Sequence, residues 1–482
     1  MKSGLQTALS LATSIGLAAI VGLIIAREFG RGAETDGFFA AYGVFIVLVL
    51  AAHAFRVVAL PALARAHGEQ KLASETTTWA LALSVLAAPA LLVSIFASSA
   101  VAAALTGSLP EAARETAAEA LVWMVPAAVG QLYAALAASA LAALDDYGTA
   151  AAGFAAGSVA GLGLILLLVG SHGIVAVAWG MALNGAVSFA IPVAALLARG
   201  RPRGLAPRHS EVPARLVEFG RGVALPLVLQ ALYLISLRFA AELGVGAVTS
   251  FTYAYLIGSA LVAVTATSLA LVSSVPLARL GLGEGRAAQH VVNTAWLALA
   301  VVAGAAGIFA LAGEGIARVL LGGDYGGEIG TELGRLVVYL SAWMIASVGV
   351  SVTFPLLFVA GRSRRLPVLS LACLALHVPL AWLGQKVFGL AGIAAALAVS
   401  TALILAGLLV LLSRETLLRV AGGLATATAW SAGLAVVSFA LLALVLPPGP
   451  AAALGLAVYA LLLVTVRPPG LLRAWSYVRA LG

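Results

Sequence analysis

The chain has 482 residues, of which 62% are hydrophobic and only 10% charged, and its mean hydropathy is +1.10. A soluble domain could not hide so much apolar surface, so the composition excludes one and indicates a helical protein that crosses a membrane many times. The formal net charge of +8 does not indicate nucleic acid, because the basic residues lie in short loops, as orientation signals of membrane proteins do.

Long apolar runs occur along the whole chain and predict an all-α polytopic fold with about 14 membrane-spanning helices. Glycines, prolines and charge clusters separate the runs. The first run begins close to Met1 without an obvious cleavage site, so we expect it to be retained. The predicted spans are 5–26, 37–60, 77–106, 117–143, 149–170, 173–198, 216–241, 247–275, 288–312, 333–360, 366–384, 387–412, 420–446 and 451–466.

The basic residues fall unevenly when these spans alternate across the membrane with the N-terminus inside. The seven on the outside are Arg27, Arg31, Arg114, Arg238, Arg318, Arg335 and Lys386, and the other 20 of the 27 fall inside. Cytoplasmic loops carry an excess of Lys and Arg. The split therefore predicts an even number of spans with both termini in the cytoplasm.

A charged stretch from Ala26 to Tyr42 joins the first two predicted spans, and a weaker copy follows 214 residues later. The matched pairs are Gly30 and Gly244, Gly32 and Gly246, Ala33 and Ala247, Thr35 and Thr249, and Ala40 and Ala254. Three further matches keep the same order: 60–65 with 275–279, Trp79 with Trp296, and 173–178 with 389–394. Four matches in one order predict an internal duplication.

The loop 199–215 is the most basic of the chain, contains three prolines and follows six predicted spans. It predicts a boundary between two six-helix lobes, 1–198 and 216–412, joined by a basic cytoplasmic linker. With six spans each, the lobes are parallel repeats related by an axis along the membrane normal, as in two-lobed transporters. Two extra helices and a short cytoplasmic tail make up 413–482.

Polar side chains within the spans are costly unless they face a cavity or a partner. Tyr42, His53 and Arg56 lie close to one face of the second span. The seventh span carries a second set, which is Gln230, Tyr233, Arg238 and Glu242. Because guanidinium groups bind phosphate with bidentate contacts, these residues and Arg27 predict a wet cationic cavity between the lobes. The alternatives are a local ion pair of Arg27 with Glu28 or Asp36, and snorkelling of Arg56 to the surface.

Catalytic and nucleotide-binding patterns are missing from the sequence, so we expect neither an enzyme nor a built-in ATP engine. The single cysteine, Cys373, excludes an internal disulfide and argues against a cysteine-based metal site. No cofactor is predicted. The acidic pair Asp145-Asp146 falls in a predicted inside turn, where we expect it to be solvated. Asp36 and Glu242 are the candidates for coupling transport to an ion.

The stretch Ala26-Arg27-Glu28-Phe29-Gly30, followed by Thr35-Asp36-Gly37-Phe38-Phe39, resembles the first periplasmic turn of the MurJ/MviN family of lipid-linked peptidoglycan precursor flippases. The layout of two six-helix lobes plus two C-terminal helices is similar over the whole chain. The resemblance implies alternating access in the bacterial inner membrane. It also implies that the substrate is a polyprenyl-diphosphate saccharide, lipid II or a related lipid-linked sugar, whose tail follows a groove of the last two helices.

The family's functional arginines are replaced here. Those of the first helix fall at Ile15 and Val21, those of the second fall near Val49, and the eighth helix offers no match. Only Arg27 and Asp36 carry over, and Arg56 could stand in from a neighbouring turn. A different lipid-linked sugar is therefore nearly as well supported as lipid II.

The predicted substrate-binding residues are Arg27, Asp36, Tyr42, His53, Arg56, Gln230, Tyr233 and Arg238. We expect a monomer whose partners are the lipid-linked saccharide and membrane lipids. Two alternatives stay open. One is a drug/cation antiporter of the same superfamily, which needs a buried carboxylate. The other is a non-transporting scaffold with the loop 199–215 as its docking surface.

Overall fold

The computed structural model describes residues 2–199, 207–267 and 284–481. Over these ranges the protein forms sixteen α-helices, a few short 3-10 or π segments and no strand. Twelve helices of the described part are long and apolar enough to cross a membrane. The prediction of an all-α polytopic membrane protein is therefore confirmed, while the number of about 14 spans stays a prediction.

Some predicted spans differ from the helices that form. The span 77–106 is two helices, α3 (Leu72–Phe96) and α4 (Ser98–Thr106), interrupted at Ala97. The span 333–360 likewise divides into α12 (Gly327–Tyr339) and α13 (Ser341–Val359) at Leu340. The range labelled α14 (Leu366–Leu412) holds two predicted spans, 366–384 and 387–412, and is not one straight helix. Gly389, with φ 59°, is non-helical and breaks it near the start of the second predicted span. Gly384 and Gly392, on either side of the break, lie backbone against backbone, since a methyl group on Gly384 would be 2.4 Å from the carbonyl oxygen of Gly392.

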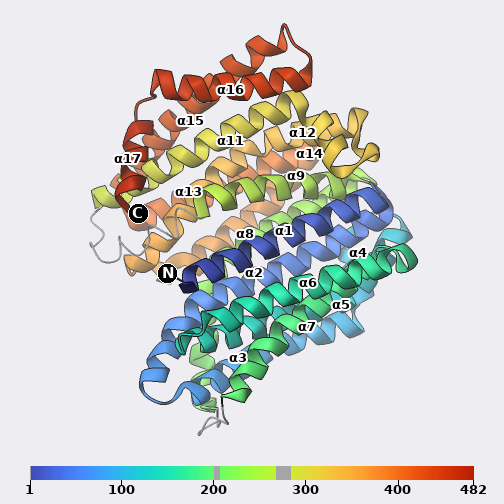
Figure 1. Ribbon diagram of the computed structural model, residues 1–482, viewed down its shortest axis with the longest axis vertical. Coiled ribbons are helices and arrows are strands. Elements are labelled where there is room, and N and C mark those ends of the chain that lie inside the picture. Colours follow the sequence, from blue (N-terminus) through green and yellow to red (C-terminus); the bar gives the residue numbers. More distant parts are fainter. Residues whose placement is uncertain (1, 200–206, 268–283, 482) are drawn as a thin grey trace. The chain divides into compact units, whose positions relative to one another are not determined.

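The chain divides into two compact units, unit 1 from Met1 to Thr249 and unit 2 from Ser250 to Gly482. In unit 1, α2 packs along α5, α5 packs on α7, and α6 packs on both α7 and α1 (Figure 1). The helices of unit 1 are α1 (Lys2–Phe29), α2 (Ala33–Gly68), α3, α4, α5 (Glu111–Ala143), α6 (Tyr147–His172), α7 (Val175–Ala198) and α8 (Val212–Ala240).

Small residues set the close spacing of these helices. A methyl group on Gly130 would lie 3.0 Å from the carbonyl oxygen of Gly185, and one on Gly161 would lie 2.6 Å from that of Gly180. Such small-residue contacts are the usual means of helix association in lipid, where hydrophobic burial gives little driving force. They hold α5, α6 and α7 together as one bundle.

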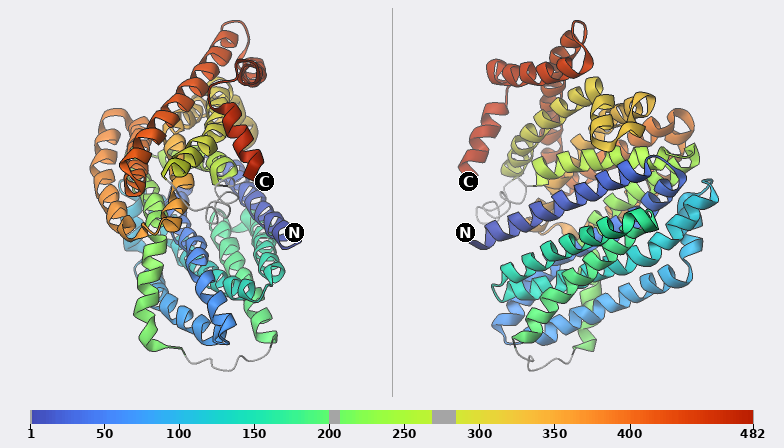
Figure 2. Two further views of the ribbon diagram at one scale, coloured as in Figure 1. Left: turned by 90° about the vertical axis from the view of Figure 1, so that its left-hand side faces the viewer. Right: turned by 45° about the vertical axis from the view of Figure 1, so that its right-hand side comes forward.

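In unit 2 the helix α11 (Glu284–Leu321) contacts most of the other helices (Figure 2). Those contacts include α12 (Gly327–Tyr339), α13 (Ser341–Val359), α15 (Arg414–Ala443), α16 (Pro448–Val466) and α17 (Leu471–Leu481). The helix α9 (Ala247–Val262) starts at the end of unit 1 and continues into unit 2. The glycines Gly307 and Gly455 leave room for the ring of Phe439 from α15.

The predicted duplication of 1–198 and 216–412 remains a prediction. The helix α8, which the sequence assigns to the second lobe, packs within unit 1. The copy segment 275–279 and part of the basic linker, residues 200–206, lie outside the described residues.

Candidate functional site

The turn between α1 and α2 is built by the charged stretch that the sequence singles out. Gly30 ends α1 in the left-handed region with φ 58°, which glycine adopts at little cost. After it, the hydroxyl of Thr35 donates to the carbonyl oxygen of Phe29 at 3.4 Å and ties the first turn of α2 back to α1. Phe38 and Phe39 are buried, with 1% and 2% of their surface exposed. The turn is therefore a fixed part of the fold.

Gly37 lets this turn sit directly against α5. A methyl group at Gly37 would overlap the carbonyl oxygen of Ala113, in the first turn of α5. The glycine of the Thr-Asp-Gly-Phe-Phe motif is thus explained by close approach of two helices. It leaves the neighbouring Asp36 pointing away from α5.

The side chain of Asp36 is completely buried and reaches the copy of its own stretch. One carboxylate oxygen accepts from the backbone N–H of Thr249 at 2.8 Å and from its hydroxyl at 2.6 Å, and the other accepts from the backbone N–H of Gly246. These two N–H groups belong to the start of α9, where helical N–H groups lack partners within the helix. Asp36 supplies both those partners and a negative charge at the positive end of the helix dipole.

A further hydrogen bond joins the same two segments, with the donor now on the first stretch and the acceptor on its copy. Arg31 donates from Nε to the carbonyl oxygen of Gly246 at 2.9 Å. Gly246 has φ 87°, and a methyl group on it would overlap the Arg31 side chain. We call the bonds of Arg31 and Asp36 to Gly246 and Thr249 the hairpin contact. It joins the two copies of the repeated stretch within unit 1.

The other predicted residues of α2 lie along the same helix at different depths. Tyr42 stacks between Phe38 and Phe45, with ring centroids 6.2 and 5.8 Å away. Arg56 is half-buried and its guanidinium carbon lies 5.9 Å from the centre of the Phe154 ring on α6. The side chain of His53 lies outside the described part of the structure.

The predicted residues of α8 divide in the same way. Tyr233 is fully buried and Gln230 is half-buried. Arg238 forms an ion pair with Glu242 one turn later, and its guanidinium group lies against the turn at Gly107. Arg27, at the end of α1, is exposed.

These residues do not form a single site. Arg56 follows Asp36 by 20 positions in one continuous helix, a separation of about 30 Å at 1.5 Å per residue. Arg27 precedes the hairpin contact by only a few residues, and Arg238 ends α8 just before it. The three predicted arginines therefore fall at two levels, Arg27 and Arg238 beside the hairpin contact and Arg56 toward the other end of α2.

A further cluster, at the far end of α8 from the hairpin contact, is absent from the sequence-based set. Arg215 of α8 pairs with Glu75 of α3 at 2.8 Å and with Glu218 at 2.9 Å, and its guanidinium carbon lies 5.5 Å from the ring centre of Trp79. The carboxylate of Glu75 is nearly buried, with 4% of the side chain exposed. We call this arrangement the α3–α8 contact. Arg215 was assigned only to the basic linker, because a pair 140 residues apart leaves no local pattern.

Sequence reasoning also missed Arg31, Gly246 and Thr249 as site residues. A signal for them did exist, because two of them belong to the copied stretch.

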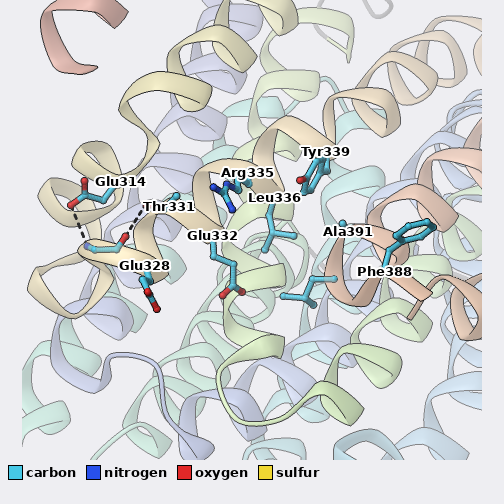
Figure 3. A pocket seen from close by; sticks show the side chains of 11 residues that line it. Glu314, Glu328, Thr331, Glu332, Arg335, Leu336, Tyr339, Phe388 and Ala391 are labelled. Carbon is cyan, nitrogen blue, oxygen red and sulfur yellow. Dashed lines mark hydrogen bonds between the residues drawn. The ribbon is translucent and has the colours of Figure 1, made fainter. Parts of the chain in front are cut away.

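Among the hollows of the described part of unit 2, two differ clearly in their lining. One is an apolar cavity of about 310 Å³ between α11, α13 and α15, whose lining includes Phe439 and Ser431. The other is an open pocket of about 850 Å³ on α11, α12 and α14, where Glu328, Glu332 and Arg335 surround the space (Figure 3). In that pocket Glu314 accepts from the backbone N–H of Gly327 at 3.2 Å. The described residues hold no group of three metal-ligating side chains placed for a metal ion.

Solved structures with a similar fold are membrane transporters. A structure of the lipid II flippase MurJ in an inward closed conformation has a TM-score of 0.74 and 14% identity, and covers 96% of this chain and 98% of that chain. An inward-facing MATE multidrug transporter of the MOP superfamily has a TM-score of 0.62, 17% identity and coverage of 85% and 99%. A MOP superfamily transporter from Pyrococcus furiosus has a TM-score of 0.58, 14% identity and coverage of 89% and 96%. At such identities these similarities show the fold alone.

The sequence itself carries the family assignment. No curated protein matches the sequence. The family model described as lipid II flippase MurJ, however, matches residues 25–460, which is most of the chain and includes the hairpin contact. The chain belongs to the MurJ lipid II flippase family.

Proposed function

We propose that this protein moves a polyprenyl-diphosphate saccharide, lipid II or a related lipid-linked sugar, across the bacterial inner membrane by alternating access. Membership of the lipid II flippase family supports a lipid-linked substrate. The observation that carries the mechanism is the hairpin contact, in which the buried Asp36 binds the start of α9. The positive-inside pattern predicts that this contact lies at the outer end of the helices.

The hairpin contact acts as the outer gate in this proposal. Its bonds join the first turn of α2 to the start of α9, so α9 cannot separate from α2 at this end while they are made. Hydrogen bonds to an ionised group contribute about 1.5–3 kcal/mol each. That energy is large enough to hold one state and small enough to be replaced by water when the outer side opens. The α3–α8 contact holds α8 at the predicted inner end in the same way.

The arginines would act in sequence on the diphosphate. Arg56 lies toward the predicted inner end and would meet the head group first, with Tyr42, His53, Gln230 and Tyr233 offering hydrogen bonds along the path. Arg27 and Arg238 lie beside the hairpin contact and would bind the head group before its release. Arg238 would exchange its ion pair with Glu242 for the phosphates. The apolar cavity on α15 would hold part of the lipid tail.

The antiporter alternative requires a buried carboxylate available for a cation. In the described residues the buried carboxylates are Asp36 and Glu75. Asp36 accepts three hydrogen bonds and Glu75 pairs with Arg215. The scaffold alternative uses the basic linker as a docking surface. Arg215 of that linker already pairs with Glu75 and Glu218, so one fewer basic side chain is available to a partner.

The test is a reversible crosslink across the hairpin contact. In a Cys373→Ala background, Asp36→Cys and Thr249→Cys would be combined and bridged by oxidation or a short thiol-reactive reagent. We expect the bridged protein to stop translocating lipid II in proteoliposomes, and a reductant to return the rate to that of the same double variant before bridging. The matched control pairs Glu34→Cys, exposed on the same turn, with Thr249→Cys. Full-rate translocation by the bridged protein would show that the hairpin contact is not a gate.

A further inference from the structure

The C-terminal end of α16 exposes a strip of apolar side chains. Leu461, Val464 and Val466 are 60%, 68% and 44% exposed. In a span of a membrane protein, such side chains face lipid. The strip ends at Arg467, which is exposed and stands in the left-handed region with φ 51°. The change from apolar to basic at this point marks where α16 leaves the hydrocarbon core.

The helix α17 begins four residues later and is attached to unit 2 by one face. Ala474 is fully buried. One turn on, the hydroxyl of Tyr477 is hydrogen-bonded to Nδ1 of His290 on α11 at 3.0 Å. Since α17 starts so soon after α16 ends and is fixed near the start of α11, it must sit at the level of the membrane surface.

A different face of α17 is exposed and amphipathic. Leu472 and Trp475, three positions apart and so on one side of a helix, are 56% and 51% exposed. Arg473 is exposed beside them. From Arg467 to Gly482 the sequence has three arginines, Arg467, Arg473 and Arg479, and no acidic residue. Exposed Trp and Leu beside basic residues are typical of helices that lie in the membrane interface.

The direction of α17 agrees with this placement. Figures 1 and 2 show α17 running at a steep angle to α16 and α11. Because α16 and α11 cross the membrane, a helix at a steep angle to them runs along the membrane plane. A third spanning helix would instead run alongside them.

We propose that α17 is an interfacial helix that binds anionic phospholipid head groups of the cytoplasmic leaflet. Leu472 and Trp475 enter the boundary between head groups and acyl chains, while Arg467 and Arg473 bind the phosphates. The lipid is favoured over a protein partner because the exposed face continues the lipid-facing strip of α16. Its charge is also opposite to that of the anionic leaflet. The proposal does not depend on which substrate the protein transports.

The depth of α17 can be measured with spin labels on the full-length protein. In the Cys373→Ala background, Leu472→Cys would be labelled with a nitroxide and the protein placed in vesicles of equal parts phosphatidylcholine and phosphatidylglycerol. We expect a depth of about 5–10 Å below the phosphates. Labels at Leu461→Cys and Asp324→Cys calibrate the core and water. A label at residue 472 as open to a water-soluble relaxation agent as the one at residue 324 overturns the proposal, and a protein partner would then be the better occupant.

The role of the charges is tested separately by native mass spectrometry with phosphatidylglycerol. The variant Arg467→Gln/Arg473→Gln should lose affinity for this lipid by about fivefold per arginine. The matched control Arg318→Gln/Arg335→Gln removes the same charge from the predicted outer side of unit 2 and should bind normally. Equal affinity in both variants would overturn the assignment of the lipid site to α17. Both variants change exposed side chains, so folding is checked by thermal unfolding alone.

Discussion

Single residues of this protein are defined by partners that lie far along the chain. Asp36 is the clearest case, because its three donors come from residues more than 200 positions away. Asp146 shows the same point at a shorter range. The pair Asp145-Asp146 was predicted to be solvated; Asp145 is exposed, whereas only 17% of the Asp146 side chain is exposed.

Asp146 caps the N-terminus of α6, so its ionisation is linked to the stability of that helix. It accepts from the backbone N–H of Thr149 at 3.0 Å and from the Thr149 hydroxyl at 2.7 Å, and it pairs with Arg199. Burial opposes ionisation, but the Thr149 bonds and the Arg199 charge outweigh it and hold the pKa of Asp146 below its ordinary value. A lowered folded pKa means that the stabilisation is present above the unfolded pKa of about 3.9 and is lost as the pH falls.

We therefore expect Asp146→Ala to lower the free energy of unfolding by about 1 kcal/mol at neutral pH. The difference from the natural protein should shrink below about pH 4, where the carboxylate becomes protonated. Thermal unfolding in detergent across this pH range measures both effects. A difference that stays constant down to acid pH would contradict the role of the charge. Asp145→Asn, at the adjacent position outside the cap, is the control, because Asn tolerates the left-handed φ of 60° that Asp145 adopts.

At the scale of helices, contact depends on the absence of side chains at a few positions. Gly37 brings α2 against α5, and Gly246 brings the start of α9 against Arg31. Neither role follows from helix propensity, which only disfavours glycine.

Gly37→Ala should separate α2 from α5 at the hairpin turn. The added methyl group would overlap the Ala113 carbonyl oxygen, and overpacking of this kind costs about 1–3 kcal/mol. We expect a lower melting temperature and a weakened outer gate. Gly32→Ala is the matched control, since a methyl group there meets no atom within 4 Å and its φ of −136° suits any residue. Equal melting temperatures for the two variants would show that the close approach is unimportant.

At the scale of the whole molecule, composition and charge already predict how the chain lies in the membrane. Twelve candidate spans among the described residues agree with a multi-pass protein, and family membership agrees with a transporter. The predicted orientation rests on the positive-inside pattern. When the N-terminus is placed inside, 20 basic residues fall on the inside and seven on the outside.

Reporter fusions test this orientation. A phosphatase that is active only outside the cytoplasm should be inactive when fused after Gly482. A fluorescent protein that folds only in the cytoplasm should be bright at the same position. A phosphatase inserted at Asp324, in the predicted outer loop of unit 2, should be active. The reverse pattern at either position would refute the topology and, with it, the outer position of the hairpin contact.

Apolar length and local charge determine helices, because backbone hydrogen bonds in lipid must be made within the segment itself. The sequence alone therefore determined the all-α polytopic class, the family and the importance of the stretch from Ala26 to Tyr42. Only the tertiary structure decided that Asp36 binds Thr249, that Arg215 pairs with Glu75 and that the arginines stand at two levels. Such contacts depend on how helices far apart in the chain fit together, and that fit has no local signature beyond the single repeat at a shift of 214 residues.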